Sequence, residues 1–364
     1  MNKPLGSQPS GSPLPNTIWY TRCPVPTASG IAIQKGWLAE AFAPDGIAVH
    51  SMRHSQDPKT RESHYTHTLD NSFRQGGNTP ALFARSDGKD TVLLGLHWIP
   101  QYQAILTLPG SGIATIKQLR GRKLALPRRV NDAIDFWRAT ALLGYLNALR
   151  LEGLDLHDVE LVDLPIELSY VDSDVEITEA LTAAPRLSKF QTREMTALLR
   201  EEVDAMFGYS VWGASVRSQI SAVEVVNLSR HPELATQVNN GAPETLTVSG
   251  RLLREHPELV ERYVVQLVRA AEWAKRNKDA ARRAIAIETG AAEYWLDEGC
   301  QPDVAHRLTF SLDEELVKAL EARKRFLLEF GFMKSDFDVR TWMDPRPLQN
   351  ALKRAGMADQ RAMT

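Results

Sequence analysis

Cys23 stands in a short turn that suits a reactive thiol. A β-prone run over residues 17–21 leads into Cys23-Pro24-Val25-Pro26, and an apolar helical pattern follows over 29–43. The only other cysteine is Cys300, so this is not the disulfide framework of a secreted domain. A thiol near a helix N-terminus lies at the positive end of the helix dipole, which favours the thiolate. We therefore expect Cys23 to take part in catalysis. The alternative is that Cys23 is a small buried hydrophobic residue, as lone cysteines usually are, and this is what we expect for Cys300.

A histidine and an arginine provide candidate partners for this thiol. Arg74 follows His64 by ten residues and precedes Gly76-Gly77. Glycines allow backbone N–H groups to approach an anion closely, so we expect Arg74 to lie in a ligand-contacting loop. The alternatives are ordinary: His64 could lie on a solvated helix face among polar neighbours, and Arg74 could be a surface charge.

Other chemistries find less support. His50, His54, His64 and His67 suggest a metal site, but no carboxylate or thiol completes a standard ligand set, so we expect neither a metal nor an organic cofactor. The chain has no phosphate loop, nucleophile elbow or dinucleotide fingerprint. Trp137 and Trp212 are either aromatic walls of a ligand cleft or core residues.

Composition narrows the possible partners. The formal net charge is −2 and no block of like charge occurs, so nothing favours nucleic acid or an anionic membrane. No apolar run approaches the length of a membrane span. Residues 1–15 are rich in Gly, Ser and Pro and lack an apolar core, which predicts a disordered leader and a cytoplasmic protein.

Strand-like and helix-like segments alternate along the chain, which indicates an α/β fold. The C-terminal part, from Arg251 onward, is almost entirely helical in pattern. The length of 364 residues suggests about two domains. The remaining predicted strands are 47–52, 91–97, 103–108, 158–164, 203–208 and 223–228, and 116–127 is expected to form a short helical turn, a glycine stop and a strand. The segments 109–112 and 245–248 are expected to be the crossovers between the two domains. The predicted helices are 133–151, 256–276, 278–289 and 313–330.

Three segments resemble the type II periplasmic substrate-binding proteins of the sulfonate, nitrate and thiamine-precursor branch. They are Thr115–Pro127, Val203-Asp204-Ala205 and the helical tail opened by His256-Pro257-Glu258-Leu259-Val260. The resemblance implies a two-lobed fold with an interdomain cleft and a helical C-terminal region. It divides the chain into domain one, 16–109 plus 245–364, and domain two, 110–244, joined by crossovers that act as a hinge.

A narrower resemblance concerns the chemistry. Cys23-Pro24-Val25-Pro26, His64, and Arg74 with Gly76-Gly77 resemble the 2'-hydroxybiphenyl-2-sulfinate desulfinases, cytoplasmic enzymes of the same fold with a Cys, His, Arg active site. The charged segment 128–137 departs from that family, which leaves the aryl group open. The resemblance implies that Cys23, His64 and Arg74 are catalytic and that the substrate-binding residues are Arg74, Gly76, Gly77, Trp137 and Trp212.

The leading function is therefore the release of sulfite from an aryl sulfinate by C–S cleavage. Either the Cys23 thiolate attacks sulfur, or the Cys23 thiol protonates the ipso carbon, and the residues do not decide between these routes. The alternative is a non-catalytic binding protein that holds a sulfonate or similar organic anion for an ABC transporter, whose permease would then be a partner. Both readings require a small organic anion as ligand.

Overall fold

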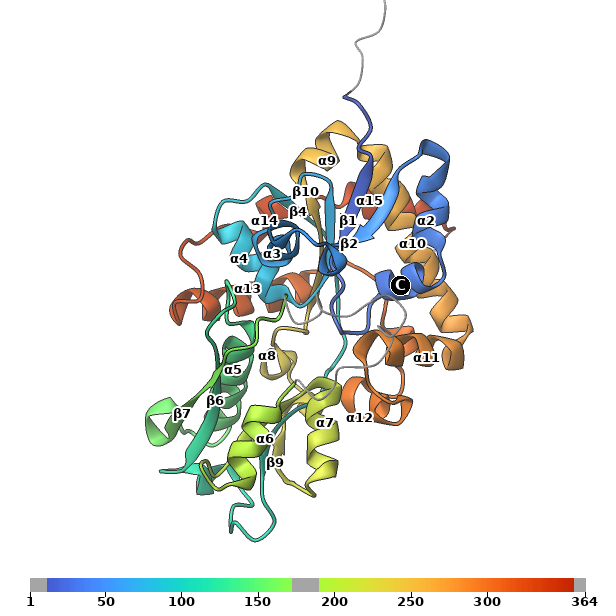
Figure 1. Cartoon of the computed structure of the whole chain (residues 1–364). Helices are drawn as coiled ribbons and strands as arrows, with labels where there is room; N and C mark the ends of the chain where they lie inside the picture. Colours follow the sequence, from blue (N-terminus) through green and yellow to red (C-terminus); the bar gives the residue numbers. More distant parts are fainter. Residues whose placement is uncertain (1–11, 172–189, 357–364) are drawn as a thin grey trace, which may run out of the picture.

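The computed structural model describes residues 12–171 and 190–356 (Figure 1). Most of the predicted leader, 1–15, and the last residues of predicted domain one lie outside the described residues. Within the described part, none of the helices is long and apolar enough to cross a membrane.

A five-stranded sheet carries the candidate residues from the N-terminal part of the chain. Its strand order is β2-β1-β3-β10-β4, in which β1 is parallel to β2 and β3, whereas β10 is antiparallel to β3 and β4. The segment 245–248, predicted as the crossover back to domain one, is itself part of a strand of this sheet. The strands are β1 (Thr17–Tyr20), β2 (Ala48–Ser51), β3 (Ser72–Gly76), β4 (Thr91–His97) and β10 (Glu244–Ser249).

Two smaller sheets form the other part of the molecule (Figure 1). Their orders are β8-β5-β9 and β6-β7, with β5 antiparallel to both neighbours and β6 parallel to β7. Because β5 pairs with strands of predicted domain two, the crossover expected at 109–112 comes one strand too late. These strands are β5 (Gln103–Thr107), β6 (Lys123–Arg129), β7 (Glu160–Ile166), β8 (Met206–Tyr209) and β9 (Val223–Asn227).

Helices cover the sheets and make up the C-terminal region. The single helix predicted over 29–43 is two helices, α1 and α2, because Gly36 between them has a left-handed φ of +74°. The described helices are α1 (Ala28–Gln34), α2 (Trp37–Phe42), α3 (Pro58–Thr66), α4 (Asn78–Ser86), α5 (Phe136–Arg150), α6 (Thr192–Leu199), α7 (Ser210–Gln219), α8 (Leu234–Gln237), α9 (Gly250–Glu255), α10 (Pro257–Arg276), α11 (Lys278–Thr289), α12 (Leu296–Cys300), α13 (Glu314–Glu329), α14 (Val339–Trp342) and α15 (Arg346–Arg354).

The helix α10 fixes the position of β3 from one side of the large sheet. Its apolar stripe includes Tyr263, whose ring stacks on that of Phe73 with centroids 3.7 Å apart and planes 4° from parallel. Since side chains alternate along a strand, Arg74 points to the opposite face of the sheet from Phe73. The apolar core on one face therefore holds the strand whose other face carries the candidate cation.

Candidate active site

The turn that carries Cys23 is held at several points. The N–H of Thr21 donates to the Phe73 carbonyl at 3.1 Å, which ties the end of β1 to β3. Arg22 forms an ion pair with Glu288 of α11, with Nη2 and Oε2 3.2 Å apart. Arg53 donates through Nη1 to the Arg22 carbonyl at 3.5 Å. As a result, Cys23 is held in the interior, with 7% of its surface exposed.

His64 lies on the helix α3, whose first residue is marked clearly in the sequence. Asp57 caps the helix by accepting from the N–H groups of Lys59 and Thr60, and Pro58 occupies the first turn. The His64 side chain is 2% exposed, so the solvated helix face considered above is wrong. Burial, followed by the charges of Arg74 and Arg53, holds the pKa of His64 well below its usual value, and the ring is neutral.

Arg74 lies on β3, and the loop predicted for it is wrong. The segment Ser-Phe-Arg-Gln-Gly lacks the β-branched residues that mark strands in sequence, yet all five of its residues are buried. Arg74 is 3% exposed, and its Nε and Nη1 atoms have no hydrogen-bond partner among the described residues. A buried guanidinium remains charged, and leaving it unpaired is costly, so an anionic ligand would stabilise this arrangement.

The glycines after Arg74 allow close contacts with two other segments. Gly76 has a φ of +149°, and a Cβ built there would lie 2.6 Å from the Cys23 Sγ. A Cβ on Gly77 would lie 2.4 Å from the Asn240 Nδ2. The chain therefore passes directly against the thiol at Gly76 and against the Asn240 side chain, in the segment before β10, at Gly77.

Burial dominates the state of the thiol. It raises the pKa of Cys23, and the nearby Arg74 charge lowers that pKa by a smaller amount. The expectation of a thiolate favoured by a helix N-terminus is therefore wrong, because burial penalises the charged form of the thiol. Cys23 is a protonated thiol in the ligand-free protein.

The two tryptophans lie in one connected group of aromatic rings. Trp212 stacks on Phe190 at 4.1 Å, and its ring centroid is 5.9 Å from that of Trp137. Trp137 donates through Nε1 to Glu194 at 2.7 Å. The group continues to His64 through the remaining members, with Trp137–Phe136, Phe136–Tyr170 and Tyr170–His64 centroid distances of 5.8, 5.4 and 5.3 Å.

The structure thus brings Cys23, His64 and Arg74 close enough for the Arg74 charge to act on the pKa of the other two. Sequence reasoning did not find Arg53 or Tyr170, which lie beside His64, or Glu288, which holds Arg22. No local motif distinguishes these residues from other polar and aromatic residues.

Two further hypotheses concerned a metal site among the histidines and the role of Cys300. In the ranges 12–171 and 190–356, no three His, Cys, Asp or Glu side chains gather in a way that could hold a metal ion. Cys300 is fully buried at the end of α12, where burial raises the pKa of its thiol, in agreement with a packing role.

Comparison of the chain with known sequences finds a likeness over nearly its full length. No family model matches. The 2'-hydroxybiphenyl-2-sulfinate desulfinase of Rhodococcus erythropolis is 28% identical over 369 aligned positions, which cover 94% of this chain and 95% of that protein. The putative aliphatic sulfonates-binding protein of Bacillus subtilis is 33% identical, but only over 27% of this chain and 29% of its own length.

Solved structures give the same result. The crystal structure of the desulfurization enzyme DSZB matches with a TM-score of 0.74 and 26% identity, and covers 94% of this chain and 100% of that one. A cysteine-to-serine mutant of DSZB in complex with biphenyl-2-sulfinic acid matches with a TM-score of 0.72 and 25% identity over 93% of this chain and 99% of that one. The periplasmic aliphatic sulphonate binding protein SsuA of Escherichia coli shares the fold, with a TM-score of 0.63 and 14% identity over 91% and 92%. The α/β fold of the periplasmic-binding-protein type is therefore confirmed, and the chain is similar over nearly its whole length to 2'-hydroxybiphenyl-2-sulfinate desulfinase.

Proposed function

We propose that this protein is a cysteine-dependent desulfinase that releases sulfite from an aryl sulfinate. The observation that carries the proposal is the buried Arg74 guanidinium, whose Nε and Nη1 atoms lack partners among the described residues and whose charge acts on both Cys23 and His64. A sulfinate has one negative charge shared by two oxygens, which matches the two-pronged geometry of a guanidinium. The full-length likeness to a desulfinase supports the same substrate class.

The connected aromatic rings supply a surface for the aryl group. Tyr170 lies beside His64, and the rings continue through Phe136 and Trp137 to Trp212. Aromatic faces bind an aryl group by offset or edge-to-face stacking, in addition to the apolar area that is buried. We therefore assign the sulfinate to Arg74 and the organic part of the substrate to this aromatic surface.

The protonated state of Cys23 favours the route in which the thiol is an acid. The Cys23 S–H donates its proton to the ipso carbon, the C–S bond breaks, and its electron pair forms the new C–H bond. Sulfur leaves as sulfur dioxide, and water adds to give bisulfite and a proton, which restores the thiol. The thiolate left on Cys23 between these steps is stabilised by Arg74, whose charge lowers the thiol pKa.

In these reaction steps, His64 is suited to orient the Cys23 thiol or the water that hydrates sulfur dioxide. Its ring is neutral because burial and two arginines oppose protonation. Its Nδ1 atom is buried and has no hydrogen-bond partner among the residues that the structure describes. A neutral imidazole in this position can orient the thiol or the hydrating water without adding a second charge to the anion site.

The competing function is a binding protein for a sulfonate or similar organic anion. The partial likeness to a sulfonates-binding protein and the shared fold favour it, and Arg74 would serve it equally well. A buried thiol against Gly76 has no purpose in binding alone. The role of Cys23 therefore separates the two functions.

The test is sulfite release from a panel of aryl and alkyl sulfinates by wild type, Cys23→Ser and the matched control Cys300→Ser. We expect sulfite from wild type and from the Cys300 variant, and none from the Cys23 variant, which should still bind the sulfinate. If no sulfinate yields sulfite while the ligands still raise the melting temperature of wild type, the protein is a binding protein.

A further inference from the structure

The face of the large sheet that lies under α3 is polar. Thr21 follows β1, Ser72 and Arg74 lie on β3, and Thr247 lies opposite Arg74 on β10. All four side chains are buried. Sheet faces that pack against a helix are usually apolar, since buried hydroxyl and charged groups need hydrogen-bond partners. The buried polar side chains on this face therefore need hydrogen-bond partners.

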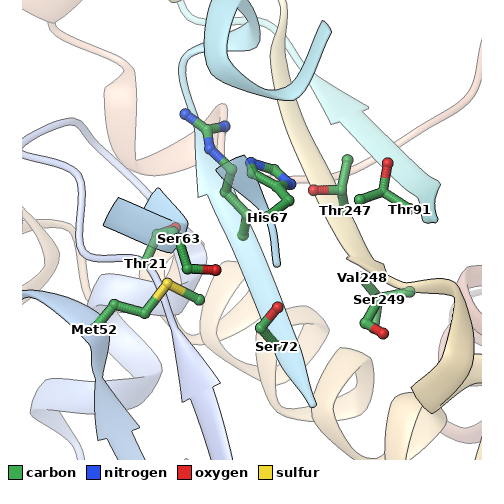
Figure 2. A pocket seen from close by; sticks show the side chains of 10 residues that line it. Thr21, Met52, Ser63, His67, Ser72, Thr91, Thr247, Val248 and Ser249 are labelled. Atoms are coloured by element: carbon green, nitrogen blue, oxygen red, sulfur yellow. The ribbon is translucent and has the colours of Figure 1, made fainter. Parts of the chain in front are cut away.

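These side chains, together with His67, line a small internal cavity of about 10 Å³ (Figure 2). That volume is about the size of the space needed by one water molecule, and it is too small for a sulfinate. Four of the lining residues carry buried side-chain atoms that have no hydrogen-bond partner in the described part of the chain: Nε and Nη1 of Arg74, Oγ1 of Thr21, Oγ1 of Thr247 and Nε2 of His67.

Other polar groups at the cavity are satisfied by the protein itself. Ser72 donates through its hydroxyl to the Leu69 carbonyl at 2.8 Å, and the Thr91 hydroxyl accepts from Trp342 Nε1 at 3.1 Å. The Ser63 hydroxyl accepts from the N–H groups of Thr68 and Leu69. The lack of partners is thus specific to the groups around Arg74.

We propose that the cavity holds one water molecule, which accepts a hydrogen bond from Arg74 and donates one to Nε2 of His67, so that His67 is a positioning residue for Arg74. The two threonine hydroxyls complete the four hydrogen bonds that a buried water can make. The water then holds one N–H group of the guanidinium in place, and the remaining N–H groups are left for the anion. The functional part of this inference rests on the proposed role of Arg74 in sulfinate binding.

The backbone at His67 supports a role for its side chain. His67 ends α3 with a left-handed φ of +51°, and its N–H donates to the Ser63 carbonyl at 3.0 Å. Glycine or asparagine is the usual residue in that conformation, which costs other residues about 1 kcal/mol or more. Burial and the Arg74 charge also hold the pKa of His67 well below its usual value, so the ring is neutral and its Nε2 can accept.

The first arm of the test is a high-resolution crystal structure of wild type without substrate. We expect one ordered water in hydrogen-bond contact with Arg74 and His67. A dry cavity would overturn the proposal. This arm needs no turnover, so it is independent of whether the protein is an enzyme.

The second arm measures benzenesulfinate binding by calorimetry in His67→Phe, His67→Gln and the exposed control His157→Phe. Loss of the acceptor should weaken binding about tenfold in the Phe variant, because a buried donor is left unsatisfied. The Gln variant, which keeps an acceptor oxygen, and the control should bind like wild type. Equal affinity of the Phe variant and wild type would refute the positioning role. Absence of sulfite release with these binding results intact would refute the desulfinase function alone.

Discussion

The contact between Gly76 and Cys23 gives a sharp test of the site geometry. In Gly76→Ala, the new Cβ would lie 2.6 Å from the Cys23 Sγ and 2.9 Å from its Cβ. An ordinary contact requires at least 3.4 Å, so the thiol must move by about 0.8 Å or β3 must shift. The backbone adds to this, because a φ of +149° is one that alanine rarely adopts.

The costs of the backbone strain and of the steric overlap can each be estimated. Backbone strain at such a φ costs about 1–3 kcal/mol, and overpacking a buried site typically costs a further ~1–3 kcal/mol. A displacement of about 1 Å of a reacting group lowers a rate by roughly a hundredfold. We therefore expect Gly76→Ala to lose about 3 kcal/mol in free energy of unfolding and about a hundredfold in kcat at a temperature where it remains folded.

The matched control is Gly88→Ala. Gly88 also has a positive φ, +76°, but a Cβ there meets nothing within 4 Å. It should lose about 1 kcal/mol in stability and no turnover. Urea unfolding and sulfite release would be measured for both variants. If folded Gly76→Ala releases sulfite at the wild-type rate, the close contact has no part in holding the thiol, and the active-site geometry described above is wrong.

Four further predictions test other parts of the site. Arg74→Lys should bind benzenesulfinate at least tenfold more weakly by calorimetry, because a lysine cannot contact both oxygens through a planar fork; unchanged affinity would remove Arg74 from the site. Trp212→Leu should raise KM for aryl sulfinates about tenfold and leave alkyl sulfinates nearly unaffected, whereas equal effects on both would rule out stacking. Arg22→Gln leaves Glu288 buried without its cation, so the free energy of unfolding measured in urea should fall by about 1–3 kcal/mol. The double variant with Glu288→Gln should recover part of that loss. His64 has a lowered pKa in the folded protein, so the unfolded chain binds its proton first and stability should fall as the pH drops below the ordinary histidine value of 6.5; His64→Asn should make urea midpoints less dependent on pH there.

The sequence was most informative where chemistry and local pattern coincide. The turn Cys23-Pro24-Val25-Pro26 lies at the end of a strand, as expected, and the long helices α10 and α13 were predicted from their hydrophobic periodicity. The break at Gly36 could have been predicted from the glycine alone, but the apolar residues on both sides favour one continuous helix.

The protonation of the Cys23 thiol and the strand that carries Arg74 could not be predicted from the sequence, because both depend on burial. The strand β3 has the sequence of a polar loop and becomes a strand because it lies between β1 and β10. The thiol pKa follows from contacts between segments far apart in sequence, and the helix dipole argument, which uses only neighbours, gave the wrong direction. The same holds for Arg22, whose partner Glu288 lies on α11.

The place of β10 between β3 and β4 has a consequence for the order in which the protein is made. β3 and β4 leave the ribosome early, but the strand that joins them ends only at Ser249. Until then, β3 has an open edge on the side that β10 later covers, and open strand edges are sites of mispairing between chains. The sheet that carries Arg74 is completed only after the strands of the two smaller sheets have been synthesised. A chain that stops before β10 would therefore contain Cys23, His64 and Arg74 without the complete sheet that positions them.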